Sequence, residues 1–167
     1  MAVSVSVRSY THAVTYVTDN LLRSLKDVIR LSGLDPSKFA SDWNTLHNGI
    51  KTWIESGHLN TIVLEVYNPS DNSLVGRWDI AISYGYTSGD GSFWTDTDDI
   101  RYAIKKAGVY ASSCRYDVIV DNKPFAPSVA GWVDSSFRST SGMVKQSIGT
   151  TVEASGLSGG FSYYRRG

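Results

Sequence analysis

The sequence predicts a single α/β domain of 167 residues, built from amphipathic helices and a β-hairpin. Apolar residues recur with helical spacing over Tyr10–Ile29 and again over Phe39–Trp53. A β-branched run, Thr61–Tyr67, is followed by a turn cluster and by an alternating strand over Leu74–Tyr86. A chain of this length can bury a substantial core, so these elements are expected to pack together as one domain.

The composition favours a globular protein that does not specialise in nucleic acid. Hydrophobic residues make up 41% and charged residues 19% of the chain, and 16 lysines and arginines balance 16 aspartates and glutamates. A dedicated nucleic-acid binder would show an excess of basic residues. Only the final YYRRG has the aromatic and basic residues that could contact nucleic acid. A single cysteine, Cys114, excludes an internal disulfide, and there is neither a signal-peptide pattern nor an apolar run of ~20 residues. We expect a cytoplasmic protein.

The first two predicted helices have recognisable ends. Ser9 or Thr11 can cap the first helix, and Gly33 can end it in a left-handed conformation. Its apolar stripe spans about six turns, which predicts a helix at the centre of the core. The second helix is expected to start near Asp35–Pro36 and to end near Gly57.

A loop, a third helix and a third strand follow the hairpin. The glycine-rich Thr87–Trp94 reads as a loop, and Thr95–Ala107 reads as a helix that Gly108 ends. Cys114–Asp121 is rich in β-branched residues and predicts a strand.

The chain changes character after Asp121. Residues 122–167 mix many serines and glycines with large apolar side chains, too many for a solvated linker. We expect a long irregular segment that wraps the core, with one loosely alternating strand from Met143 to Val152. At the other end, Ala2–Val7 reads as a short strand, a mobile arm or a frayed terminus.

No catalytic constellation emerges from the sequence. The three histidines lack metal-ligand spacing, and Cys114 has no nucleophile signature around it. Helix capping explains the acidic cluster Asp96, Asp98 and Asp99 better than a metal site does. The loop that holds Gly89 and Gly91 lacks a phosphate-binding lysine.

The unusual C-terminal third suggests a latch. If one edge of the sheet is unpaired, an extended peptide can add to it through backbone hydrogen bonds. A C-terminal segment that passes over such a peptide would trap it and slow its release. The residues alone therefore favour a protein that clamps a peptide.

Four passages resemble the bacterial HORMA domain proteins of CBASS, the cyclic-oligonucleotide antiphage signalling operons. They are YTHAVTYVTDNLLRSLKDVI (10–29), GRWDI (76–80), DGSFWTDTDDIRYAIKKAG (90–108) and FRSTSGMVKQSIGTTVEASGL (137–157). The resemblance covers essentially the whole chain and rests on long strings. It implies an α+β HORMA fold with three helices on a small antiparallel sheet, and a C-terminal safety belt.

The resemblance also implies a division of the chain into a mobile N-terminal arm (1–8), a core (9–121) and a safety belt (122–167). In the closed state the belt of a HORMA protein encircles a closure-motif peptide that pairs with the third core strand, and part of the belt pairs with the strand Leu74–Tyr86. The peptide-binding residues expected on that strand and the belt are Arg115, Tyr116, Asp117, Val118, Ile119, Val120, Met143, Val144 and Ile148.

The partners follow from the same resemblance. The closed protein would bind and activate a cyclic-oligonucleotide synthase (CD-NTase), and an AAA+ ATPase would open it through the N-terminal arm, with Val3, Val5, Val7 and Arg8 as its handle. A second HORMA protein is a further expected partner in some operons, and no cofactor is expected. Two alternatives remain open: a constitutive interaction or oligomerisation domain without a switch, and a small-molecule-binding or enzymatic domain that uses the Gly89–Gly91 loop and the acidic cluster Asp96, Asp98 and Asp99.

Overall fold

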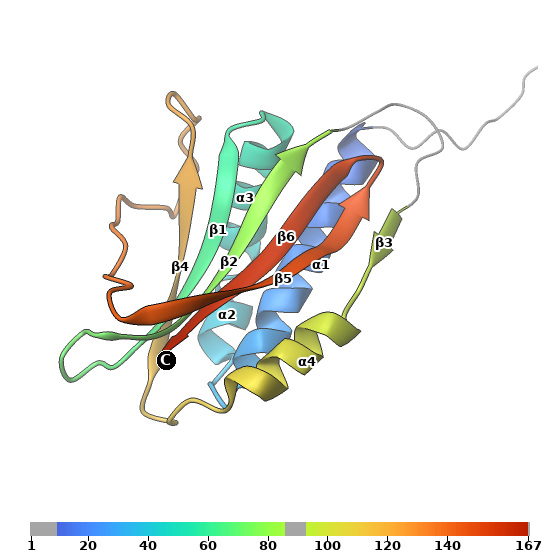
Figure 1. Cartoon of the computed structure of the whole chain (residues 1–167). Helices are drawn as coiled ribbons and strands as arrows, with labels where there is room; N and C mark the ends of the chain where they lie inside the picture. The colour runs from blue at the N-terminus through green and yellow to red at the C-terminus, as the bar shows by residue number, and fades with distance from the viewer. Residues whose placement is uncertain (1–9, 86–92, 167) are drawn as a thin grey trace, which may run out of the picture.

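A computed structural model describes residues 10–85 and 93–166, with helices packed on an antiparallel sheet (Figure 1). The six strands follow the order β3-β5-β6-β2-β1-β4, and every neighbouring pair is antiparallel. The α+β class is therefore confirmed, with a larger sheet than expected.

The helix α1 (Tyr10–Leu31) forms the centre of the core, as its apolar stripe predicted. Its buried side chains face the sheet and α3, and Leu21, Leu25 and Ile29 are fully buried. Gly33 follows the helix at φ 86°, a conformation that glycine adopts without a Cβ penalty. None of the helices in the two described stretches is both long and apolar enough for a bilayer crossing.

The second predicted helix is two helices, which corrects the expected continuous span from Asp35 to Gly57. The short α2 (Ser37–Ser41) ends at Asp42, and α3 (Trp43–Glu55) begins there. The break has a packing reason. Phe39 is buried, and its amide donates a hydrogen bond of 3.1 Å to the Tyr116 hydroxyl. These contacts hold α2 against β4 as a helix separate from α3.

The hairpin of β1 (Leu59–Tyr67) and β2 (Leu74–Tyr84) forms as predicted. The third predicted helix begins later than Thr95, because Phe93–Thr95 forms a short strand, β3, before α4 (Asp98–Ala107). The predicted third strand is β4 (Arg115–Asn122). Most of the predicted loop Thr87–Trp94 lies outside the described residues.

The C-terminal third is more regular than expected. β5 (Met143–Ala154) and β6 (Leu157–Arg166) form a long hairpin through a tight turn at Ser155 and Gly156, both with positive φ. β6 pairs with β2 from Arg77–Tyr164 to Tyr84–Leu157, so the C-terminal segment does pair with the predicted strand. Residues 123–142, between β4 and β5, have no regular structure apart from short turns.

One glycine explains why this hairpin was hard to predict. A Cβ on Gly159 of β6 would lie 2.8 Å from a methyl carbon of Leu21 and 3.1 Å from carbons of Ile80 and Val152. α1 therefore approaches β6 too closely for any side chain. Glycine lowers strand propensity in the sequence, but here close packing requires it.

Candidate functional site

β4 lies at the end of the sheet. One of its edges pairs with β1, and no strand in the described part of the chain pairs with the other. The register with β1 places Tyr116, Val118 and Val120 on the helix-covered face, and Asp117 and Ile119 on the opposite face. Such an edge presents backbone groups to which an extended peptide can pair.

The crossing segment, residues 123–142, leaves the end of β4 and first docks on the helices. The Lys123 amide donates to the carbonyl of His58 at 2.7 Å, and the Trp53 indole N–H donates to the carbonyl of Pro127 at 2.7 Å. These bonds fix the start of the crossing segment beside the free edge of β4.

Trp132 is the main anchor on the helix side. Its indole N–H donates to the carbonyl of Thr45 at 3.0 Å, and its ring meets the Trp53 ring edge-on with centroids 4.9 Å apart. A Cβ on Gly49 would lie within 2.3 Å of the Trp132 ring nitrogen. The surface of α3 is therefore shaped to receive this indole.

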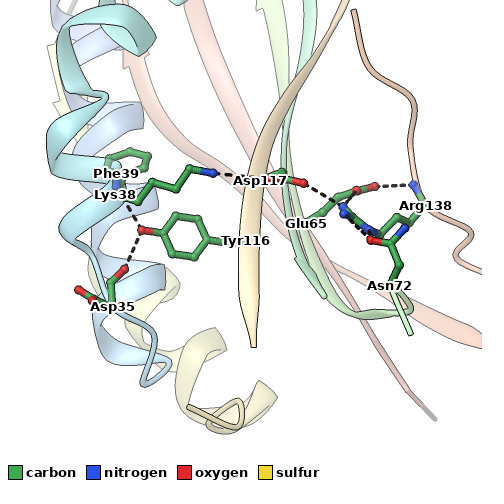
Figure 2. Close-up of polar contacts among 8 residues, drawn as sticks. All are labelled: Asp35, Lys38, Phe39, Glu65, Asn72, Tyr116, Asp117 and Arg138. Atoms are coloured by element: carbon green, nitrogen blue, oxygen red, sulfur yellow. Dashed lines mark hydrogen bonds and ion pairs between the residues drawn. The ribbon is translucent and has the colours of Figure 1, made fainter. Parts of the chain in front are cut away.

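Arg138 is the anchor on the opposite face of the sheet (Figure 2). Its amide and its Nη1 each donate to the carboxylate of Glu65 at 2.8 Å, and Nη1 also reaches Asp117 at 3.2 Å. The guanidinium bonds the side-chain oxygen of Asn72 and lies 3.7 Å over the Tyr67 ring. Burial lowers the pKa of Arg138, but the bonds to the two carboxylates outweigh it and raise the pKa above its ordinary value. The anchor stays charged.

Between these two anchors the chain passes around the free edge of β4. Trp132 sits on α3 and Arg138 on the other face of the sheet, so residues 133–137 must cross from one side to the other. Figure 1 shows the crossing segment in orange running beside β4. Val133 is 86% exposed at the crossing. Strand edge and crossing segment together form a closed ring.

Two hollows lie inside this ring and together form the edge groove. One of about 390 Å³ is lined by Phe39 and Leu46 of the helices, and one of about 360 Å³ by Pro127 and Val129 of the crossing segment. Both are bounded by the same residues at the centre, Val118, Ile119, Trp132, Val133 and Ser135. The edge groove is therefore continuous along β4, and its walls mix apolar side chains with polar ones.

Polar contacts fix the wall that α2 contributes (Figure 2). The Tyr116 hydroxyl donates to the carbonyl of Asp35 at 2.7 Å and accepts from the Phe39 amide. Burial raises the pKa of Tyr116 above its ordinary value, so this hydroxyl stays a donor further into the alkaline range than a free tyrosine does. Lys38 reaches Asp117 at 3.6 Å, so one carboxylate on β4 contacts both α2 and the crossing segment.

The structure brings together most of the expected strand residues. Residues 116–120 line the edge groove, whereas Arg115 begins β4 and lines neither hollow. Met143, Val144 and Ile148 lie on β5, which pairs with β6, and they line neither hollow. The expected handle, Val3, Val5, Val7 and Arg8, lies outside the described residues.

Sequence reasoning missed the two anchors. A signal for one was present: Glu65 is the single charged residue within the apolar run TIVLEVY, and a buried carboxylate requires a cationic partner. Trp132 is one of several aromatic residues in the C-terminal third. Only the fold places it opposite Gly49.

The other candidate sites have structural explanations. Asp96 Oδ1 accepts from the amides of Asp98 and Asp99 at 3.0 and 3.3 Å, so it caps α4. Within the described ranges, no cluster of histidine, cysteine and acidic residues has the makings of a metal site. Cys114 is half-buried against the core.

Comparison with known proteins relates this chain to one protein family. The family model described as Bacterial HORMA domain 2 matches residues 2–167. A search of curated proteins gives no significant match.

Solved structures share the fold at low sequence identity. A chain of the mitotic checkpoint complex is 10% identical with a TM-score of 0.76, and the match covers 92% of this chain and 98% of that one. C. elegans HTP-2 bound to the HIM-3 closure motif is 10% identical with a TM-score of 0.62, and the match covers 92% of this chain and 87% of that one. A chain of the E. coli MS115-1 CdnC:HORMA-deltaN complex is 10% identical with a TM-score of 0.60, and the match covers 99% of this chain and 94% of that one. With a family model matched over nearly its whole length, the chain belongs to the bacterial HORMA domain family.

Proposed function

We propose that this chain binds an extended peptide as an added strand on β4 and holds it beneath the crossing segment, which is the part of the safety belt that passes around the strand edge. One observation carries the proposal: the edge groove lies between a free strand edge and a segment anchored on both faces of the sheet. A peptide paired with β4 would send alternate side chains toward Phe39 and Leu46 and toward the opposite face. The structure of C. elegans HTP-2 with a closure motif supports this role for the fold.

The belt would act mainly on the release of the peptide. Because Trp132 and Arg138 anchor the crossing segment on opposite sides of β4, the ring must open before a long peptide can leave. Affinity differences between related complexes lie mostly in the dissociation rate. We place the arm at residues 1–8, the core at 9–121 and the belt at 122–167.

The test is peptide selection followed by dissociation kinetics. Peptides selected from a random library on the full chain should dissociate from Trp132→Ala at least about tenfold faster than from wild type, since truncation of an aromatic hot-spot residue costs about 2 kcal/mol or more. Trp94→Ala is the matched control, because Trp94 is a partly exposed tryptophan on β3. Equal dissociation rates in Trp132→Ala and wild type would refute the clamp. A selection that yields no peptide would favour the constitutive interaction domain.

The peptide-bound chain is proposed to act as an adaptor that binds and activates a cyclic-oligonucleotide synthase, rather than as an enzyme. Support comes from the resemblance to CBASS proteins and from the CdnC:HORMA-deltaN complex, which contains a chain of this fold. Nucleotide product formed by a synthase should rise only when both chain and peptide are added. Product formation that is independent of the peptide would contradict the adaptor role.

An AAA+ ATPase is proposed to open the belt through the N-terminal arm. Removal of residues 1–8 should leave peptide binding intact and abolish ATP-dependent peptide release. The arm is not the handle if release by the ATPase continues without it.

A further inference from the structure

We propose a second binding site, remote from the edge groove, that takes an extended acidic segment of a partner protein with one bulky apolar side chain. The site is a hollow of about 690 Å³ where α1 and α4 end. We call it the helix-end hollow. Its lining residues are Arg30, Leu31, Arg101, Tyr102, Ile104, Lys105, Gly108 and Val109. It shares no lining residue with the edge groove.

The helix-end hollow gathers exposed apolar surface. Leu31 is 37%, Tyr102 63% and Val109 75% exposed, and all three line it. Scattered exposed apolar side chains are ordinary, but a concave cluster of them marks a contact site. Its volume falls within the range of about 300–1,000 Å³ that is usual for ligand sites.

The wall formed by residues 108–110 is fixed before any partner arrives. The Tyr110 amide donates to the carbonyl of Ser32 at 2.9 Å. Val109 packs so closely on Gly33 that a Cβ there would lie 2.6 Å from the valine methyl. An apolar side chain that enters the hollow therefore meets a shaped surface, which lowers the entropic cost of binding.

The basic side chains of the helix-end hollow favour an acidic partner. Arg30, Arg101 and Lys105 line the hollow, and among the described residues no carboxylate does. Arg30 pairs with Asp27 at 3.3 Å, whereas Arg101 and Lys105 form no ion pair with any described residue. The two helix ends contribute about half a negative charge each, which does not offset the two cations Arg101 and Lys105. In a chain of balanced charge, this local excess favours carboxylates, which arginine binds in a bidentate manner.

The test uses two synthetic peptide pools on the full chain. Each peptide carries Leu, Phe or Trp at its centre, flanked by two glutamates on each side in one pool and by two lysines on each side in the other. Fluorescence polarisation should show the glutamate pool binding at least about tenfold more tightly, with affinity falling as salt rises. Equal binding of the two pools would overturn the proposal. So would binding of a single-stranded oligonucleotide in preference to the glutamate pool.

Variants locate the site. Arg101→Glu with Lys105→Glu should weaken the glutamate pool at least about tenfold. Lys51→Glu with Arg165→Glu makes the same change in net charge elsewhere and should leave binding unchanged. Trp132→Ala should also leave it unchanged, which separates this site from the proposed peptide clamp. If Trp132→Ala abolished binding, or if the Arg101 and Lys105 variant bound as wild type, the helix-end hollow would not be the site.

Discussion

Arg138 and Glu65 form an ion pair that joins the crossing segment to β1, the strand next to the free edge of the sheet. Glu65 is fully buried on β1, 73 residues away in sequence, and receives one bond from the Arg138 backbone and one from its guanidinium. A buried carboxylate that loses its cation is costly. The position of residue 138 is therefore coupled to the stability of the folded core.

This pair gives the first prediction. Arg138→Ala should lower the free energy of unfolding by about 3–5 kcal/mol, because it leaves the Glu65 carboxylate buried without its main cation. Glu65→Leu combined with Arg138→Met should recover most of that loss, since it removes both charges at similar volume. Urea denaturation of the single and double variants measures both effects. A loss below about 1 kcal/mol in Arg138→Ala would show that the pair is not coupled to the core.

Helix and strand periodicity in the sequence was sufficient to locate α1, β1, β2 and β4, because each buries one face or stripe in a regular pattern. The hairpin β5–β6 was only half predicted. Its buried positions include Gly159, which contributes no apolar signal although its place is fixed by contact with α1. Local sequence does not record such a long-range constraint.

In the candidate site too, some features follow from a local sequence pattern and others only from long-range contacts. The free edge of β4 could be anticipated as a strand, but its anchors depend on contacts between residues distant in sequence. Trp132 meets Thr45, and Arg138 meets Glu65. Neither pairing follows from a local pattern, so the crossing segment could be expected only as a wrapping element of unknown path.

The second prediction compares two adjacent glycines of β6. Gly159→Ala should destabilise the fold by about 1–3 kcal/mol, because the new methyl overpacks the contact with Leu21. Gly160→Ala is the control: its Cβ would meet nothing closer than 3.8 Å. Thermal unfolding followed by circular dichroism should separate the two variants. Equal melting temperatures would mean that α1 can move away from β6 at no cost.

The third prediction concerns alkaline pH. Burial raises the pKa values of Tyr84, Tyr110 and Tyr116 in the folded state. The unfolded chain ionises its tyrosines near pH ~10, before the folded protein does, so stability is full below that pH and is lost as pH rises toward the folded pKa values. The slope should reach about 1.4 kcal/mol per pH unit for each such tyrosine.

Tyrosine variants check this assignment. Tyr84→Phe should make the loss of stability above pH ~10 less steep, although it also removes the 2.7 Å bond to the Leu59 carbonyl and so lowers stability at neutral pH. Tyr102→Phe is the control, since Tyr102 is largely exposed. Denaturant unfolding at several pH values measures the slope. The same slope in all three proteins would show that Tyr84 does not control the alkaline transition.

The last prediction separates the anchor of the belt from the stability of the core. Gly49→Ala places a methyl where the Trp132 indole lies, so the indole must move away from α3. Alanine also favours the helix by up to about 1 kcal/mol over glycine, so the core should not be lost. Limited trypsin digestion should cut faster after Lys123 and Arg138 in this variant, because the crossing segment is released. Asn48→Ala, a neighbouring exposed position on the same helix, should digest as wild type does. If Gly49→Ala is cut no faster than Asn48→Ala, the contact of Trp132 with α3 does not hold the segment, and the proposed belt is anchored by Arg138 and by the hydrogen bonds at Lys123 and Pro127.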